Sequence, residues 1–168
     1  MKKINLSNFV FGLFALTASQ CLMASEYWLH GNIGSVQTPS QLQLVKAGAG
    51  AIATIPAATS GTGGWLQFPL PLQTNLYLPN STVTKILLQY TGNAKIDQVD
   101  VWHGSTKVGG ASVNWTGSNS RAILALPTPV TTIRGLNISV HVKNNCAAGS
   151  LCPKQTMKII SVGSVLTP

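Results

Sequence analysis

The sequence predicts an all-β protein built as an antiparallel β-sandwich, and three observations support this. Short runs rich in Val, Ile, Leu and Thr recur along the chain, and several alternate apolar with polar residues, as half-buried strands do. Clusters such as TSGTGG, YTGN, WHGS and WTGSNS are expected turns between these runs. Helical periodicity is nearly absent, so crossover helices are not expected. Jelly-roll and immunoglobulin-like arrangements are the two sandwich alternatives.

The first 24 residues are expected to be a secretory signal peptide, followed by one domain at 25–168. MKK is a cationic start, and the apolar run at 9–18 (FVFGLFALTA) is too short to cross a bilayer as a helix. Cys21 raises the alternative of a lipid anchor, but Gln20 stands before it where a small residue is expected. We therefore expect a secreted, periplasmic or extracellular protein with no transmembrane segment in its mature part.

Three strands are expected in the first half of the mature chain. QLQLV (41–45) and AIATIP (51–56) are short apolar runs. GWLQFPL (64–70) alternates, so that its leucines and its phenylalanine share one face. Pro69 and Pro71 cannot donate to a sheet ladder, so the end of this strand is expected at an edge or a turn.

Four further strands are expected after residue 82. VTKILLQY (83–90) places Ile, Leu and Tyr on one face. AILALP (122–127) and MKIISVGSVL (157–166) are apolar enough for strands. LNISVHV (136–142) is the clearest, because its apolar residues alternate with Asn, Ser and His, which is typical of a half-buried strand.

The stretch AKIDQVDVWHGSTKV (94–108) departs from simple alternation. The step from Ile96 to Val99 is three residues, which breaks the period of two. A β-bulge at 97–98 would restore the pattern and keep the apolar residues on the inner face. The residues then expected on the outer face, and in the turn that follows it, are Asp100, Trp102 and His103.

Cys146 and Cys152, in NNCAAGSLCP, are expected to form a disulfide. They are an even pair in a chain that is expected to be exported. Their spacing is wider than the redox motif C-x-x-C, and no second pair of metal ligands accompanies them. On the chain-entropy model, so short a loop adds roughly 2 to 3 kcal/mol of stability.

The scarcity of acidic residues argues against an enzyme. Glu26, Asp97 and Asp100 are the three acids of the chain, whereas a glycosidase needs two carboxylates that flank the scissile bond. There is no G-x-S-x-G motif. Asp100 and His103 are three residues apart on an expected strand, too far for a base and its orienting carboxylate. No catalytic residue and no cofactor are predicted, and a small hydrolase is kept only as the last alternative.

The charge pattern and the histidines predict neither nucleic-acid binding nor a metal site. The formal charge is +8, and loss of the two lysines in MKK leaves +6, but the basic residues are spread singly. His30, His103 and His141 lack the spacing of a zinc site. Asp97 and Asp100 alone are a weak calcium motif.

The tryptophans suggest a binding function. Trp102 and Trp115 lie in turn-like contexts, VWHGS and VNWTGSNS, where an indole offers a flat apolar face beside Asn, Ser and His. This combination suits carbohydrate or another cell-surface polymer. The alternatives are that the indoles cap the core, or that the chain is a structural or adhesive subunit that assembles through sheet edges, in an oligomeric state the sequence does not give. The candidate ligand-binding residues are Trp102, His103, Asn114 and Trp115.

Four stretches between about Trp28 and Val142 form a recognisable set: WLHGN…SVQ, GGWLQFPLP, KILLQYTGNAKIDQVDVWHGSTKV and GLNISVHV. In these stretches the chain resembles a family of small exported β-sandwich proteins known only as a domain of unknown function. The loop CAAGSLC lies outside the shared pattern. The resemblance implies the fold, and it implies no activity and no catalytic residue.

Overall fold

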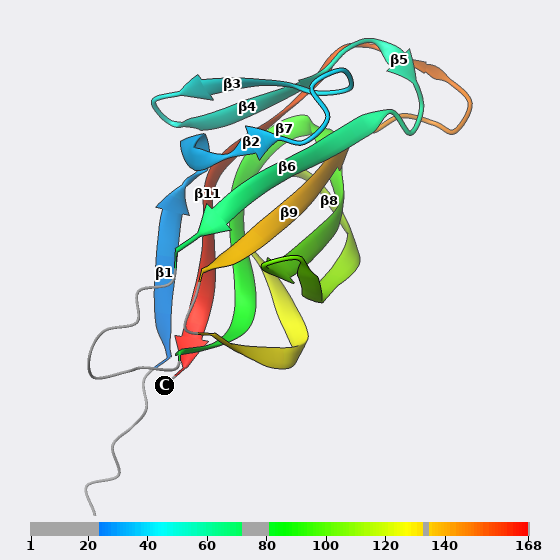
Figure 1. The fold of residues 1–168 in the computed structure, drawn as a ribbon. Coiled ribbons are helices and arrows are strands. Elements are labelled where there is room, and N and C mark those ends of the chain that lie inside the picture. Colours follow the sequence, from blue (N-terminus) through cyan, green and yellow to red (C-terminus); the bar gives the residue numbers. More distant parts are fainter. Residues whose placement is uncertain (1–23, 72–80, 133–134, 168) are drawn as a thin grey trace, which may run out of the picture.

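A computed structural model describes residues 24–71, 81–132 and 135–167, and it shows an antiparallel β-sandwich (Figure 1). Every strand pair is antiparallel, so the predicted fold class is confirmed. The predicted signal peptide falls almost wholly outside the described residues. Among those described, no helix is long and apolar enough to span a membrane.

The elements are β1 (Ser25–His30), η1 (Gly31–Ile33), β2 (Ser35–Val36), β3 (Gln43–Ala47), β4 (Gly50–Ile55), β5 (Ala58–Thr59), β6 (Gly63–Leu70), β7 (Ser81–His103), β8 (Thr106–Thr132), β9 (Leu136–Lys143), β10 (Leu151–Cys152) and β11 (Gln155–Thr167).

Two long strands, β7 and β8, run through both layers of the sandwich (Figure 1). Residues 82–92 of β7 pair with β11, which also pairs with β1 and β4, and β3 pairs with β4. We call this layer sheet I. Residues 95–102 of β7 pair with β9, which pairs with β6, and β6 pairs with β2. We call this second layer sheet II. Strand β8 follows β7 through both sheets.

The core lies between the sheets and confirms the predicted inner faces. The apolar residues of 64–70, 83–90 and 136–142 that alternation placed together are all buried in one cluster. Strand β2 pairs with β6 only at Leu66 and Gln67, so at Pro69 the side of β6 away from β9 has no described partner strand, which suits a residue without an N–H. The innermost side chains include Leu66, Phe68, Ile86, Leu88, Ile96, Ile138 and Ile159.

The predicted bulge in β7 is confirmed. The register of β7 against both β8 and β9 shifts between Ile96 and Gln98. As a result Ile96, Val99 and Val101 are all fully buried in the core cluster. The extra residue therefore leaves the polar residues that alternate with Val99 and Val101, first Gln98 and then Asp100, on the outer face of sheet II.

Two of the predicted turns are wrong. YTGN (90–93) and WTGSNS (115–120) lie inside β7 and β8, which bend together where they leave one sheet for the other. Gly92 and Gly117 are paired at this bend. A Cβ at Gly92 would come 2.3 Å from the carbonyl oxygen of Thr156, and Gly117 has a φ of 69°. The glycines thus mark a bend in paired strands. The turn at WHGS is confirmed, because Gly104, with a φ of 61°, lies between β7 and β8.

The predicted disulfide between Cys146 and Cys152 is present, with 6.0 Å between the Cα atoms. It closes a loop at one end of the molecule, where β5 pairs with β10. Buried Asn144 braces this end, because its Oδ1 accepts from the Gly61 N–H at 2.7 Å and its Nδ2 donates to the Thr59 carbonyl at 2.7 Å.

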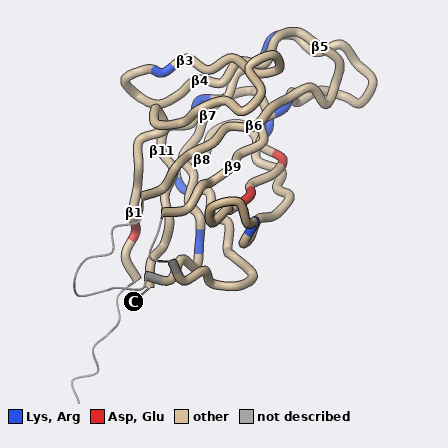
Figure 2. The backbone as a smooth tube through the Cα atoms, in the orientation of Figure 1, with Lys and Arg blue, Asp and Glu red and all other residues tan. Residues whose placement is uncertain are grey.

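Figure 2 shows lysines and arginines scattered over several strands, as their single spacing in the sequence predicts.

Candidate functional site

The outer face of sheet II carries an unusual concentration of polar and aromatic side chains. Strands β6, β9 and β7 lie side by side, and each points its apolar residues into the core. The alternate residues must therefore face outward, where they form three successive rungs across the strands. These rungs are Trp65, His141 and Gln98; Gln67, Ser139 and Asp100; and Pro69, Asn137 and Trp102.

An open groove of about 540 Å³ runs over these rungs. Trp65 and Trp102 both line it, two strands and four residues apart, which corresponds to roughly 16 Å between their Cα atoms. The groove therefore offers two separate indoles to one ligand. Its lining residues are Gln37, Trp65, Gln67, Asp100, Trp102, Gly104, Ser105, Asn137 and Ser139.

Gln67 is the centre of the polar network in the groove. Its Oε1 accepts from the Ser139 hydroxyl at 2.6 Å and from Nδ2 of Asn137. Its Nε2 donates to Oε1 of Gln37 at 2.9 Å. Three partners thus fix the Gln67 amide, and through it the orientation of the Asn137 and Gln37 amides. The network supplies donors and acceptors that are already in place before a ligand arrives.

Asp100 lies at the wall of the groove with its charge compensated. Its carboxylate is buried and accepts from Nζ of Lys107 at 2.8 Å and from Nε2 of Gln98 at 3.1 Å. Gly110 makes room for it, because a Cβ there would come 2.7 Å from Oδ1 of Asp100. A buried carboxylate needs such partners, and here they come from the same molecule.

A second ionic cluster adjoins Trp65. Oδ1 of Asp97 accepts from Nδ1 of His141 at 2.6 Å, and Oδ2 accepts from Nζ of Lys143 at 2.7 Å. Burial on its own raises the pKa of Asp97, but the hydrogen bonds from Lys143 and His141 outweigh burial and hold the pKa below its usual range. The His141 ring lies against Trp65, with 4.9 Å between ring centroids and 52° between planes.

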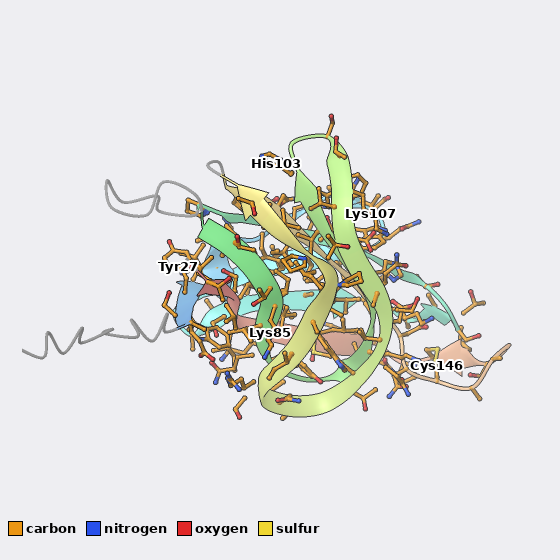
Figure 3. The ribbon with its side chains drawn as sticks, turned by 90° about the horizontal axis from the view of Figure 1, so that it is seen from below. Tyr27, Lys85, His103, Lys107 and Cys146 are labelled. Carbon is orange, nitrogen blue, oxygen red and sulfur yellow. A yellow bond between two sulfur atoms is a disulfide. The ribbon has the colours of Figure 1, made fainter. Side chains whose placement is uncertain are left out.

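Of the four predicted site residues, Trp102 alone lines the groove, His103 is next to it in the chain, and Asn114 and Trp115 lie elsewhere. Trp102 lines the groove, and His103 follows it at the end of β7, beside the hairpin turn and Lys107 (Figure 3). Trp115 lies on β8, where it pairs with Ile96 of β7, and it packs against the core. Its ring stacks on Tyr90, with centroids 6.1 Å apart. Asn114 is exposed beside it, so these two are not brought together with Trp102.

Sequence reasoning missed Trp65, Gln67, Asn137 and Ser139. Each was visible as a polar or aromatic position on the face opposite the apolar residues of a predicted strand. The pattern gave their orientation, but it did not show that β6, β9 and β7 are neighbours, which is what joins them into one site.

The described residues contain no group of three or more His, Cys, Asp or Glu side chains that could hold a metal ion. The groove instead combines flat apolar rings with fixed amides and hydroxyls. That combination can bind a ligand that has both apolar faces and many hydrogen-bonding groups.

Comparison with known proteins gives likenesses in fold alone. No family model and no curated protein sequence matches the chain, so the resemblance to a domain of unknown function stays a prediction. TmCBM61, solved in complex with β-1,4-galactotriose, is 14% identical with a TM-score of 0.45, over 80% of this chain and 86% of that one. CtCBM11, solved in solution, is 11% identical with a TM-score of 0.38, over 88% and 91%. The family 11 carbohydrate-binding module of the cellulosomal cellulase Lic26A-Cel5E of Clostridium thermocellum is 12% identical with a TM-score of 0.34, over 86% and 89%. Likenesses at this level do not assign a function.

Proposed function

We propose that the protein is a non-catalytic module that binds carbohydrate through the groove on the outer face of sheet II. The observation that carries the proposal is that Trp65, Trp102 and the Gln67 network line the same groove. A sugar ring has an apolar C–H face and a rim of hydroxyls. The indoles match the face, and the fixed amides match the rim.

The charges beside the groove favour an uncharged ligand. Asp100 is compensated by Lys107, and Asp97 by Lys143 and His141. A sulfated or uronic-acid polymer would have to displace one of these partners or bind without ionic contacts. Binding is therefore expected to change little with salt, because no counterions of the ligand are released.

Affinity electrophoresis tests the proposal. The protein is run through gels that contain soluble galactan, β-glucan, xylan or mannan, beside Trp65→Ala and Trp102→Ala. We expect retardation by at least one polymer, and each variant should weaken it about tenfold, or roughly 1.4 kcal/mol.

Trp115→Ala is the comparison that places the site, because Trp115 packs against the core away from the groove. If it still binds as the wild type does, the groove is supported. If a folded Trp115→Ala alone loses binding, the ligand depends on Trp115 and the groove is the wrong surface. Retardation by none of the polymers would reject carbohydrate as the ligand.

We also propose that the protein is exported, with cleavage after residue 24. The Cys146–Cys152 disulfide supports this, because disulfides persist in oxidising compartments. The measurement is the N-terminal sequence of the protein recovered outside the cytoplasm, which should begin at Ser25. A chain recovered only from the cytoplasm with Met1 in place would contradict the proposal.

Assembly through a sheet edge is the second candidate function. Among the described strands, β8 pairs only with β7, so its other edge is open from Thr106 to Thr132. An open edge is a template for pairing with another strand. Light scattering coupled to gel filtration tests this: an assembly subunit would grow in mass with concentration, whereas a simple binding module would stay monomeric.

A further inference from the structure

A further indole, that of Trp28, lies on the outer face of sheet I, in the layer opposite the groove. Tyr27 and Leu29 of β1 pack against the core, so Trp28 between them faces outward. Trp28 begins a rung that continues with Gly163 of β11 and Leu87 of β7 and ends at Ile123 of β8. This rung is far from the groove in the fold, because the core separates the two outer faces.

Gly163 provides the seat for this indole. A Cβ at Gly163 would come 2.9 Å from Cδ2 and 3.0 Å from Cε3 of Trp28, and 2.4 Å from the carbonyl oxygen of Tyr27. The six-membered ring of Trp28 therefore rests on the backbone of β11 rather than standing away from the sheet. One face of the ring is covered by the strand, and the side chain stays partly exposed.

An ion pair fixes the edge of the indole. Nε1 of Trp28 donates to Oε2 of Glu26 at 3.0 Å, and Oε1 of Glu26 accepts from Nε of Arg121 at 3.1 Å and also from Nη2 of Arg121. The hydrogen bond from Arg121, followed by that from Trp28, lowers the pKa of Glu26 and keeps it ionised. Strands β11 and β7 lie between Glu26 and Arg121, so the pair reaches across the face of sheet I.

The surroundings of the indole combine apolar surface with polar groups. Leu87 is fully buried beneath this face, whereas Ile123 at the end of the rung is 43% exposed. On the neighbouring rung, the Ser161 hydroxyl donates to Oε1 of Gln89 at 3.1 Å. Half of the Arg121 side chain is exposed, so its guanidinium keeps donors that face solvent.

We propose that Trp28 is the centre of a second carbohydrate-binding site, which stacks one sugar ring on the exposed face of the indole while Arg121 and Glu26 bind its hydroxyls. The class of ligand rests on the function proposed for the groove; the site itself does not share a residue with the groove. Arg and carboxylate groups bind hydroxyls through strong charge-assisted hydrogen bonds, and here they hold each other and the ring in place beforehand.

Two sites on opposite faces have a measurable consequence. One molecule can hold two polysaccharide chains, or two distant parts of one chain, and long polymers should then be cross-linked. A module with the groove alone would bind the same polymers without cross-linking them.

The indole Nε1–H signals in ¹H–¹⁵N NMR spectra test the site. They are followed in protein that keeps the Trp28 ring, so the test does not depend on whether a Trp28 variant folds. The chain has four tryptophans, and Trp→Phe variants assign their Nε1–H signals. Oligosaccharides of galactan, β-glucan, xylan and mannan are titrated in turn. We expect the Trp28 signal to move, and to move also in the Trp65→Ala/Trp102→Ala variant, in which the groove is disabled.

The outcomes separate the two proposals. If Trp65 and Trp102 move and Trp28 does not, the groove stands and the second site falls. If Trp28 alone moves, the second site stands and the groove falls. If no indole moves with any probe, both fall.

Turbidity with the long polymer that binds gives an independent measure. The wild type should cross-link it, and Trp28→Ala should abolish cross-linking while one binding site per chain remains. Should Trp28→Ala fold poorly, Arg121→Gln, which keeps the indole, should still weaken cross-linking several-fold. Undiminished turbidity with a folded Trp28→Ala would overturn the second site.

Discussion

Nδ1 of His141 donates a 2.6 Å hydrogen bond to Oδ1 of Asp97, and this contact joins the bulge of β7 to the groove of sheet II. Asp97 is the extra residue of the bulge, since the register passes from Ile96 to Gln98. The His141 ring also lies against Trp65, with 4.9 Å between the two ring centroids. One irregularity in β7 therefore sets both the outward direction of Trp102 and the support of Trp65.

Asp97→Asn should destabilise the fold in a pH-dependent way. The folded-state pKa of Asp97 is below its ordinary value near 3.8, so its ionised form stabilises the fold above that value, and this stabilisation is lost as the pH falls through the lower folded-state pKa. We expect a loss of about 1 to 2 kcal/mol at neutral pH, because two charged hydrogen bonds go but the site is partly exposed.

Urea unfolding across a pH series measures this effect. The difference between wild type and Asp97→Asn should shrink as the medium becomes acidic. A difference that stays constant with pH would mean that the carboxylate charge is not what stabilises this cluster.

Gln67→Ala should damage the groove more than Gln37→Ala. Gln67 has three partners, and its loss leaves the buried Ser139 hydroxyl without its acceptor, which costs about 1 to 3 kcal/mol of stability. Gln37 is the exposed end of the network and has one side-chain partner in it. Chemical denaturation should show the larger loss for Gln67→Ala, and polysaccharide affinity should fall further in it. Equal losses would show that the network has no centre.

Much of the groove was encoded in alternation along single strands. The polar faces of 64–70 and 136–142 and the bulge at 97–98 follow from local pattern, and Trp102 could be named from them. The local pattern does not determine which strands are neighbours in the sheet. Strand β6 reaches β7 only through β9, which comes later in the chain, so the meeting of Trp65 with Trp102 depends on long-range pairing that no local pattern contains.

The two wrong turn predictions, YTGN and WTGSNS, both depend on a glycine, and the second also gives the wrong context for an indole. Gly92 and Gly117 look like turn residues, yet each lies within a long strand at the bend between sheets. The pattern WTGSNS predicts a turn and therefore a loop position for Trp115, but Trp115 lies within β8, packed against the core and stacked on Tyr90. Glycine permits both a turn and a close strand approach, and only the neighbouring strand decides between them.

The disulfide should stabilise the fold without shaping the groove. Replacement of Cys146 and Cys152 by serine should cost roughly 2 to 3 kcal/mol, because the unfolded chain gains loop entropy. None of the groove-lining residues lies in this loop. Thermal unfolding should therefore show a lower midpoint, while polysaccharide affinity at a temperature where the variant is folded should equal that of the wild type. A folded variant with lost affinity would show that the loop reaches the ligand.

A deletion and an insertion in β7 should have opposite fates. Deleting Gln98 removes the bulge. Ile96, Val99 and Val101 are then two residues apart, so simple alternation keeps them inward and keeps Asp100 outward. This variant should therefore fold with a modest loss of stability. Inserting one alanine after Val99 turns Asp100 and Trp102 toward the core and reverses every following side chain. A charged carboxylate there costs several kcal/mol, comparable with the whole stability of a domain. Circular dichroism and heat-induced unfolding should show a cooperative transition for the deletion and none for the insertion. A cooperative insertion variant, or an unfolded deletion variant, would mean that the faces of β7 are not set by the bulge.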